Sequence, residues 1–151
     1  MARDDFVYSV KPIGTVHSSY ITRDESTKSK VEEHIGEIEV FKEYEEGLTD
    51  IEGFSHIAVI FWMHESTFKS LMVRPIHFPD QIHGVFATKH PDRPNPLGIS
   101  ILELLSRDGN ILKVKGVDMI DKTPILDIKP YTLAYQRFPS NFGWLSKYQP
   151  H

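Results

Sequence analysis

The segment GISILELLSRDGNILKVKGVDMI, residues 98–120, decides the fold of this 151-residue chain. Two apolar runs, Gly98–Leu105 and Ile111–Ile120, flank the four residues Arg-Asp-Gly-Asn. A turn of this kind between two strand-like runs is a strong signal for a β-hairpin. We therefore expect two long antiparallel strands in this part of the chain.

Four further runs outside the hairpin have the character of strands. The run at 36–41 alternates apolar and acidic residues, as a half-buried strand does. The run at 56–64, HIAVIFWMH, is apolar throughout its interior, which indicates a strand covered on both faces. The four runs predicted as strands are Ile13–His17, Gly36–Phe41, His56–His64 and Gly84–Thr88.

Few windows repeat apolar residues at the helical period, and only Thr27–Glu33 and Phe41–Leu48 are expected to form short helices. Several strands with short connections in one small chain favour an antiparallel sheet that closes on itself. The predicted fold is mainly β: a small closed antiparallel barrel of about six to seven strands with short helices and a C-terminal arm. We expect residues 1–151 to form a single domain.

Residues 132–151 differ from the rest because aromatic residues alternate there with Pro, Ser, Asn and Gly. We expect this C-terminal arm to pack on the core or on a second copy of the chain. Stacking on nucleic-acid bases is the less favoured alternative.

Composition excludes several classes of protein. The chain has no cysteine, so disulfides and thiolate chemistry are excluded, as in a reducing cytoplasm. A formal net charge of −4 argues against a protein that coats nucleic acid by charge alone. The eight histidines lack metal-ligand spacing, and His64-Glu65 begins a zinc-protease motif that Phe68 breaks. We expect no metal, no membrane span and a cytoplasmic location.

The stretch VFATKHPDRPNPLGIS, residues 85–100, is the first candidate site. Pro94 and Pro96 restrict their own φ angles and hold the preceding Arg93 and Asn95 extended. A loop stiffened in this way presents a polar side chain at low entropic cost. An ordinary rigid turn before the next strand explains the residues about as well.

The stretch DMIDKTPILDIKPY, residues 118–131, is the second candidate. Asp118 and Asp121 follow the second strand of the predicted hairpin, and loops at strand ends often carry chemistry. Their carboxylates are suited to accept hydrogen bonds from amines or sugar hydroxyls. Ordinary turn aspartates are the alternative.

These two stretches resemble the TsaA-like, or TrmO-like, family of S-adenosylmethionine-dependent tRNA methyltransferases. Further matches run in the family's order over about Lys11–Tyr131, and RPNP-[IL]-G-x-S and D-x-x-D-x-TP-x-x-DIKPY are the most specific of them. The matching segments are PIGTVHSSY, GEIEV, YEEGLTDIEGFSHIAVIFWMHE, GVFATKHPDRPNPLGISILEL and VKGVDMIDKTPILDIKPY.

The resemblance implies a β-barrel that works as a homodimer and binds S-adenosylmethionine outside a Rossmann fold. It implies methyl transfer to the exocyclic amine of threonylcarbamoyl-adenosine beside the anticodon of tRNA. The residues it implies for the cofactor are His64, Glu65, Lys89, Ile99, Ser100, Gly116, Val117 and Asp118. Those it implies for the reaction site are Arg93, Asn95 and Asp121, with Tyr44 and Glu37 on the acceptor side.

Lys89 stands where the family usually has arginine, which keeps the charge but loses the planar fork. Methyl transfer needs donor and acceptor held in line. We expect Asn95, or a carbonyl beside it, to accept a hydrogen bond from the target amine or cofactor, and Asp118 or Asp121 to hold the other partner. Lys89 and Arg93 are expected to meet the cofactor carboxylate or an RNA phosphate. With Lys113, Lys115, Lys122 and Lys129, these two cations are expected to form a basic rim.

Two other functions stay open at this point. One is a methyltransferase that acts on a different RNA or on a small molecule. The other is a non-enzymatic module that binds S-adenosylmethionine or RNA.

Overall fold

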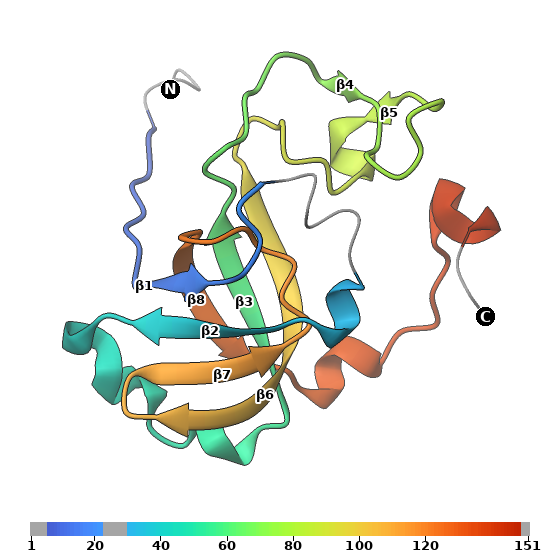
Figure 1. Ribbon diagram of the computed structural model, residues 1–151. Coiled ribbons are helices and arrows are strands. Elements are labelled where there is room, and N and C mark those ends of the chain that lie inside the picture. The colour runs from blue at the N-terminus through green and yellow to red at the C-terminus, as the bar shows by residue number, and fades with distance from the viewer. Residues whose placement is uncertain (1–5, 23–29, 149–151) are drawn as a thin grey trace.

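The computed structural model describes residues 6–22 and 30–148, and at its centre six strands form a closed barrel (Figure 1). All neighbouring strands are antiparallel, in the order β1-β2-β7-β6-β3-β8. The predicted fold class is therefore confirmed. The barrel strands are β1 (Gly14–His17), β2 (Ile35–Val40), β3 (His56–Trp62), β6 (Leu97–Asp108), β7 (Ile111–Lys115) and β8 (Pro124–Pro130).

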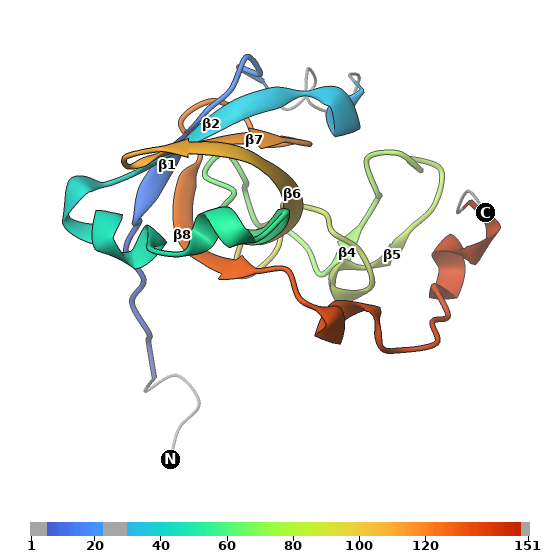
Figure 2. The ribbon, with the colours of Figure 1, turned by 90° about the horizontal axis from the view of Figure 1, so that it is seen from below.

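Between β3 and β6 the chain leaves the barrel and forms a separate lobe, residues 64–92, which we call the β4–β5 lobe (Figures 1 and 2). Its strands β4 (Met72–Val73) and β5 (His83–Gly84) make a small two-stranded sheet. The helical segments of the described residues are short 3-10 helices: η2 (Val31–Glu33), η3 (Lys42–Leu48), η4 (Ile51–Gly53), η5 (Val85–Ala87), η6 (Leu133–Gln136) and η7 (Gly143–Lys147). Among the described residues, no helix has the length and hydrophobicity that a bilayer crossing requires.

The barrel interior is filled by alternate residues of its strands, because successive side chains of a strand point to opposite faces. Branched aliphatic residues dominate this interior, which suits the close packing of a small barrel. The inward side chains with less than 2% of their surface exposed are Val16, Ile38, Val40, Ile57, Val59, Leu102, Leu112, Val114 and Ile125.

β8 is a barrel strand that the sequence patterns did not predict. It pairs with β3 over five positions and with β1 at Ile125 and Pro124, and these pairings close the barrel. Proline lacks the N–H that hydrogen bonding within a central strand requires, so the sequence of residues 124–130 did not indicate a strand. Pro124 and Pro130 fall at the two ends of β8, where this loss is tolerated.

The strand predicted at 84–88 is wrong beyond Gly84. Thr88 donates from both its backbone N–H and its hydroxyl to the Val85 carbonyl, at 3.1 and 2.9 Å, which closes the η5 turn. The predicted strand 111–120 ends at Lys115, because Gly116 has a φ of +95° that turns the chain.

The two predicted helices are short 3-10 segments. η3 occupies the run 41–48 from Lys42 onward. In the run 27–33, η2 begins at Val31, and residues 27–29 lie outside the described part of the chain.

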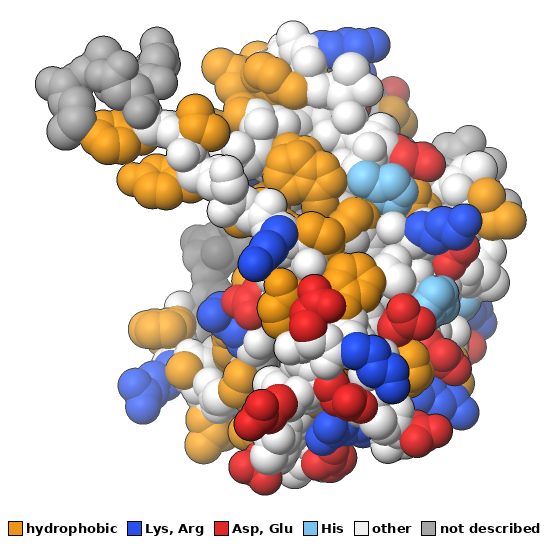
Figure 3. All heavy atoms as spheres, turned by 90° about the vertical axis from the view of Figure 1, so that its left-hand side faces the viewer, with side chains coloured by type: hydrophobic (Ala, Val, Ile, Leu, Met, Phe, Trp, Pro, Cys, Tyr) orange, Lys and Arg blue, Asp and Glu red, His pale blue; other side chains and the backbone are white. Residues whose placement is uncertain are grey.

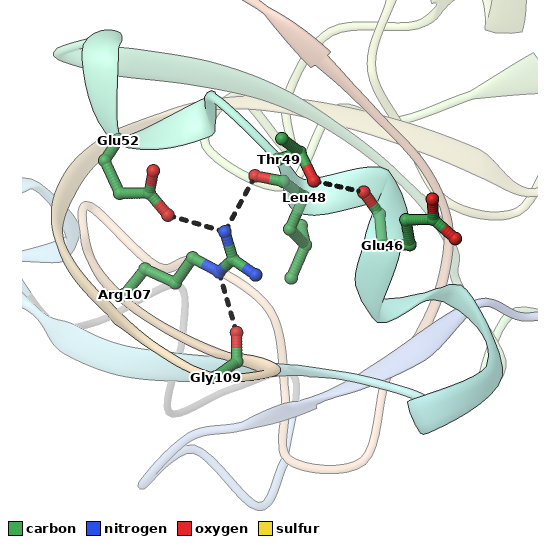
Figure 4. Close-up of polar contacts among 6 residues, drawn as sticks. All are labelled: Glu46, Leu48, Thr49, Glu52, Arg107 and Gly109. Atoms are coloured by element: carbon green, nitrogen blue, oxygen red, sulfur yellow. Dashed lines mark hydrogen bonds and ion pairs between the residues drawn. The ribbon is translucent and has the colours of Figure 1, made fainter.

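The hairpin turn is tied to the η3–η4 segment at one end of the barrel (Figure 4). Arg107 Nη1 donates to Glu52 Oε1 at 2.6 Å and to the Leu48 carbonyl at 3.1 Å, and its Nε donates to the Gly109 carbonyl at 2.7 Å. The hydrogen bond from Arg107 lowers the pKa of Glu52. We call this the Arg107 end, and Figure 3 shows acidic and basic side chains intermixed on the lower part of an adjoining face.

At the opposite end of the barrel, Gly98 lies directly across from Phe61 in the β3–β6 ladder. A Cβ atom at position 98 would collide with the Phe61 ring, which is buried against the core. The absence of a side chain at Gly98 therefore lets the ring occupy the mouth of the barrel.

We predict that Gly98→Ala lowers the free energy of unfolding by about 1–3 kcal/mol, because the ring must leave its rotamer or the strand must move. Urea denaturation measures the change. Gly84→Ala is the control: Gly84 has a φ of −59° and open space around its Cβ position, so little change is expected. Equal and small effects for both variants would contradict the account of position 98.

Candidate functional site

A cavity of about 900 Å³ opens at the barrel end that Phe61 and Gly98 line, between the barrel and the β4–β5 lobe. This end is the opposite one to the Arg107 end, because β3 finishes and β6 begins here. Residues of both sequence motifs line the cavity although they lie far apart in the chain. Cavities of this size are typical of small-molecule sites.

Asp118 is the polar residue at the barrel side of this cavity. Its Oδ1 accepts a hydrogen bond of 2.7 Å from the Ser100 hydroxyl, which points inward from β6. Burial raises the pKa of Asp118, while the Ser100 hydrogen bond, a backbone hydrogen bond and the charge of Lys89 oppose the rise. The site therefore holds a carboxylate that gains from a cation placed next to it.

The RPNP loop is fastened on both sides. The Pro96 carbonyl accepts from Met63 N–H at 2.7 Å, and Asp92 Oδ1 accepts from Thr67 N–H at 2.9 Å. Asn95 uses its carbonyl to accept from Leu97 N–H at 2.7 Å, and its residue surface is exposed. Arg93 and Leu97, two positions before and after it, line the cavity, whereas Asn95 itself does not.

Arg93 joins this loop to the end of the β4–β5 lobe. Its Nη1 donates to the Thr88 and His90 carbonyls at 2.9 and 3.2 Å, and its guanidinium lies 6.0 Å from the centroid of the Phe86 ring. Arg93 thus fixes the shape of the segment that carries Lys89. Both cations line the cavity.

The other residues predicted for the cofactor divide into two groups. His64, Glu65 and Ile99 line the cavity with Lys89 and Asp118. Ser100, Gly116 and Val117 do not line it. Ser100 contributes indirectly, because its hydroxyl holds Asp118. The N–H groups of Gly116 and Val117 both donate to the His34 carbonyl, at 2.8 and 3.2 Å.

Asp121 holds the backbone together rather than lining the cavity. Its Oδ1 accepts from Ser18 N–H at 3.1 Å, and its N–H donates to the Tyr20 carbonyl at 2.6 Å. Ile120 and Thr123, on either side of it in the chain, line the cavity. A role for Asp121 in the reaction stays a prediction.

Tyr44 and Glu37 are not brought to the cavity within one chain. Tyr44 lies in η3 and lines a second cavity, of about 570 Å³, near the Arg107 end. Glu37 is exposed on β2, across from Lys113 and His17. Their assignment to the acceptor side stays a prediction, and in a single chain it has no geometric support.

The basic rim is narrower than the sequence indicated, since of the six cations named for it only Lys89 and Arg93 line the cavity. Lys129 pairs with Asp127 at 3.0 Å, and this hydrogen bond raises the pKa of Lys129. Lys115 lies across from Glu103 in the β6–β7 ladder. Within the described ranges, no group of three or more His, Asp or Glu side chains is arranged to hold a metal ion.

The sequence patterns missed an apolar side of the cavity. Phe78 and Phe86 come from the β4–β5 lobe, and Trp144 and Leu145 come from η7. The aromatic composition of the C-terminal arm was the available signal, but it did not indicate which surface the arm covers.

Residues 15–136 match the family model of the tRNA-methyltransferase O N-terminal domain. A probable S-adenosyl-L-methionine-binding protein of Pyrococcus abyssi is 46% identical over 140 residues, which are 91% of this chain and 76% of that protein. A tRNA (adenine(37)-N6)-methyltransferase of Mus musculus is 37% identical over 107 residues, 69% of this chain but 24% of the mouse protein.

Solved structures agree with these matches. The crystal structure of TrmO from Pseudomonas aeruginosa superposes with a TM-score of 0.75 at 27% identity, covering 92% of this chain and 63% of that one. Another crystal structure of TrmO gives a TM-score of 0.77 at 29% identity, covering 93% of this chain and 65% of that one. The chain thus spans a little under two thirds of these structures. The family resemblance read from the motifs is confirmed, and the chain belongs to the tRNA-methyltransferase O N-terminal domain family.

Proposed function

We propose that this protein is an S-adenosylmethionine-dependent methyltransferase whose acceptor is the exocyclic amine of threonylcarbamoyl-adenosine beside the anticodon of tRNA. One observation carries the proposal: the two sequence motifs meet at a single cavity, where Lys89 lies close enough to Asp118 to affect its pKa. The name of the mouse relative supports methylation of adenine 37 of tRNA at N6, and the name of the Pyrococcus relative supports the cofactor. We place this activity in the cytoplasm, where tRNA is modified.

The residues of the cavity fit S-adenosylmethionine. The carboxylates of Asp118 and Glu65 suit its sulfonium and ammonium groups, and the Lys89 ammonium suits its carboxylate. The apolar side of the cavity suits a flat heterocycle. When bound, S-adenosylmethionine supplies a methyl group activated by the sulfonium charge.

The chain's own residues have to align the acceptor amine and leave its lone pair free. Asn95 is suited to accept a hydrogen bond from that amine at the rim of the cavity, because its neighbours are fastened and its side chain is exposed. Holding two reactants in line removes much of the entropic barrier to a bimolecular reaction. Asn95 is therefore assigned to acceptor positioning.

The mouth of the cavity is suited to RNA. Phe86 lines the cavity with 76% of its surface exposed, although its ring packs beside the Arg93 guanidinium. An exposed ring next to two cations offers a stacking surface for a splayed base and partners for its phosphates.

The test of this function is methyl transfer from labelled S-adenosylmethionine to tRNA with and without the threonylcarbamoyl group. Transfer only to the modified tRNA is expected. In the same assay Asn95→Ala should reduce the rate about a hundredfold while cofactor affinity is retained, because only acceptor alignment is lost. Asn95→Asp keeps an acceptor oxygen and is expected to retain more activity than Asn95→Ala.

Other outcomes separate the alternatives. Equal transfer to both tRNAs would point to a different acceptor. Cofactor binding without transfer to any RNA would leave a binding module. Full activity of Asn95→Ala would remove that residue from the reaction.

We also propose that the chain works as a homodimer through the outward face of β6. The side chains that β6 turns to solvent are mostly aliphatic, with Ile99 53% exposed. Ile99 also lines the cavity, so a second copy seated on this stripe would stand beside the site. The stripe consists of Leu97, Ile99 and Ile101, and beyond the exposed Glu103 it continues with Leu105.

Ile101→Lys is expected to convert the dimer into a monomer, because it places a charge in the centre of the apolar stripe. Sedimentation velocity measures the change. Leu133→Lys is the control, since Leu133 is 79% exposed and lies outside the stripe. A wild-type chain that is monomeric at micromolar concentration, or an Ile101→Lys dimer, would rule out this interface.

Cofactor binding should depend on pH through Asp118. Burial raises the pKa of Asp118 in the folded chain, so ionised Asp118 lowers the free energy of unfolding at neutral pH. This destabilisation disappears as the pH falls through the raised pKa. Asp118→Asn should therefore be at least as stable at pH 7, while its affinity for the cationic cofactor falls about tenfold.

Calorimetric titration over a pH series measures this dependence. Wild-type affinity should weaken as pH falls through the pKa of Asp118, and the Asn variant should lose that weakening. Ser100→Ala removes the hydrogen bond that opposes the raised pKa, so it should move the weakening to higher pH. An unchanged pH profile in both variants would exclude Asp118 from cofactor binding.

A further inference from the structure

The C-terminal arm, residues 132–148 of the described chain, docks on the β4–β5 lobe through one residue above all. The indole of Trp144 stacks on His83 at 4.0 Å between ring centroids and an interplanar angle of 13°. Its Nε1–H donates to the Ala87 carbonyl at 2.9 Å, and Phe78 meets its ring edge-on at 5.6 Å. These contacts come from three sides and fix the position of the indole.

A second contact holds the end of η7 in place. Gln81 Nε2 donates to the Tyr148 hydroxyl at 2.6 Å, and the Tyr148 ring lies 4.4 Å from the Phe78 ring. Gln81 Oε1 in turn lies 2.9 Å from His83 Nε2. The lobe and the arm are therefore joined by a network rather than by a single contact, and Figure 1 shows the arm beside the lobe.

The arm reaches the cavity as well as the lobe. Trp144 and Leu145 line it, together with Ile76 and Phe78 of the lobe. The charged lining residues Asp118, Lys89 and Glu65 lie in segments that match the family motifs, and Glu65 and Lys89 fall near the two ends of the lobe, where it joins the barrel. We call these three residues the charged side of the cavity, and Trp144, Leu145, Ile76 and Phe78 its apolar side.

We propose that Trp144 and Leu145 form the wall of the cavity that contacts the nucleoside half of S-adenosylmethionine, while the charged side takes the amino-acid half. The proposal rests on the proposed function for the identity of the ligand. The family model ends at residue 136, so this wall lies outside the matched domain. An aromatic and aliphatic wall favours a heterocycle, and a Lys–Asp pair favours a zwitterion.

The bond from Trp144 to the Ala87 carbonyl gives the arm a second effect. Ala87 lies in η5, two residues before Lys89. The indole N–H therefore helps to hold the segment that carries the cation of the charged side. Trp144 is a contact residue for the nucleoside and a positioning residue for Lys89.

The test compares two probes in the full-length chain by calorimetric titration. S-adenosylmethionine has both halves, and 5′-methylthioadenosine has the nucleoside without the amino acid. Trp144→Ala should weaken methylthioadenosine about fivefold to tenfold through the lost nucleoside contact, and S-adenosylmethionine by more, because the N–H that helps to hold Lys89 is lost as well. Lys89→Ala should weaken S-adenosylmethionine and leave methylthioadenosine unchanged.

Three further variants keep the test decisive. Leu145→Ala should weaken both probes less than Trp144→Ala does. Trp144→Phe keeps a ring but loses the N–H, so it should weaken S-adenosylmethionine more than methylthioadenosine, because Lys89 is less well held. Phe138→Ala is the matched control on the same arm, since Phe138 is 75% exposed and outside the cavity, and it should bind both probes as the wild type does.

The possible failures are distinguishable. A wild-type chain that binds neither probe would overturn the proposed function and this inference together. Wild-type binding with unchanged affinity in Trp144→Ala and Leu145→Ala would overturn the inference alone. Loss confined to S-adenosylmethionine in Trp144→Ala would also overturn it, because the wall would then contact the amino-acid half. If Trp144→Ala loses its folded circular dichroism, Leu145→Ala and Trp144→Phe decide by the same criteria.

Discussion

Closure of the barrel by β8 is the constraint on which the rest of the structure depends. β8 pairs with β3 on one side and with β1 on the other, so it joins the two edges that the other five strands would otherwise expose. The same pairing fixes the chain just before β8, where Asp121 bonds to the β1–η2 connection through Ser18. Asp118 is thereby held within 2.7 Å of Ser100, and the carboxylate of the site depends on the strand that closes the barrel.

The two barrel ends are specialised in opposite ways. At one end, Arg107 satisfies two carbonyls and one carboxylate and locks the hairpin turn to η3 and η4. At the other end, the mouth is left open, and the β4–β5 lobe and the arm surround a cavity there instead of filling it.

The sequence predicted most of the barrel because its patterns are local. The hairpin around Gly109 and the apolar run of β3 depend on periodicity and turn chemistry alone. β8 was missed because Pro124 and Pro130 stand at its ends, and the excess length given to β7 came from the apolar residues after Gly116.

The residues of the candidate site also divide into those that local motifs predicted and those that long-range packing adds. His64, Lys89 and Asp118 were found because motifs carry them, whereas Trp144 was not assigned because its partners, His83 and Ala87, are more than 50 residues away in the sequence. The packing of an irregular arm against distant residues leaves no periodic pattern in the sequence. A motif match also assigned Tyr44 to the acceptor side, and within one chain it lines the second cavity, so that assignment stays a prediction.

The alternation of side chains along β6 limits where the chain can gain or lose a residue. Its inward residues Gly98 and Ser100 leave room for the Phe61 ring and hold Asp118, and its outward residues Ile99 and Ile101 belong to the apolar stripe. Because side chains alternate, inserting or deleting one residue in this half of β6 would exchange the two faces and destroy both surfaces together. The register shift between Leu104 and Ser106 shows that the half nearer the turn already accommodates an irregularity. Length variation is therefore incompatible with this fold on the cavity side of that shift.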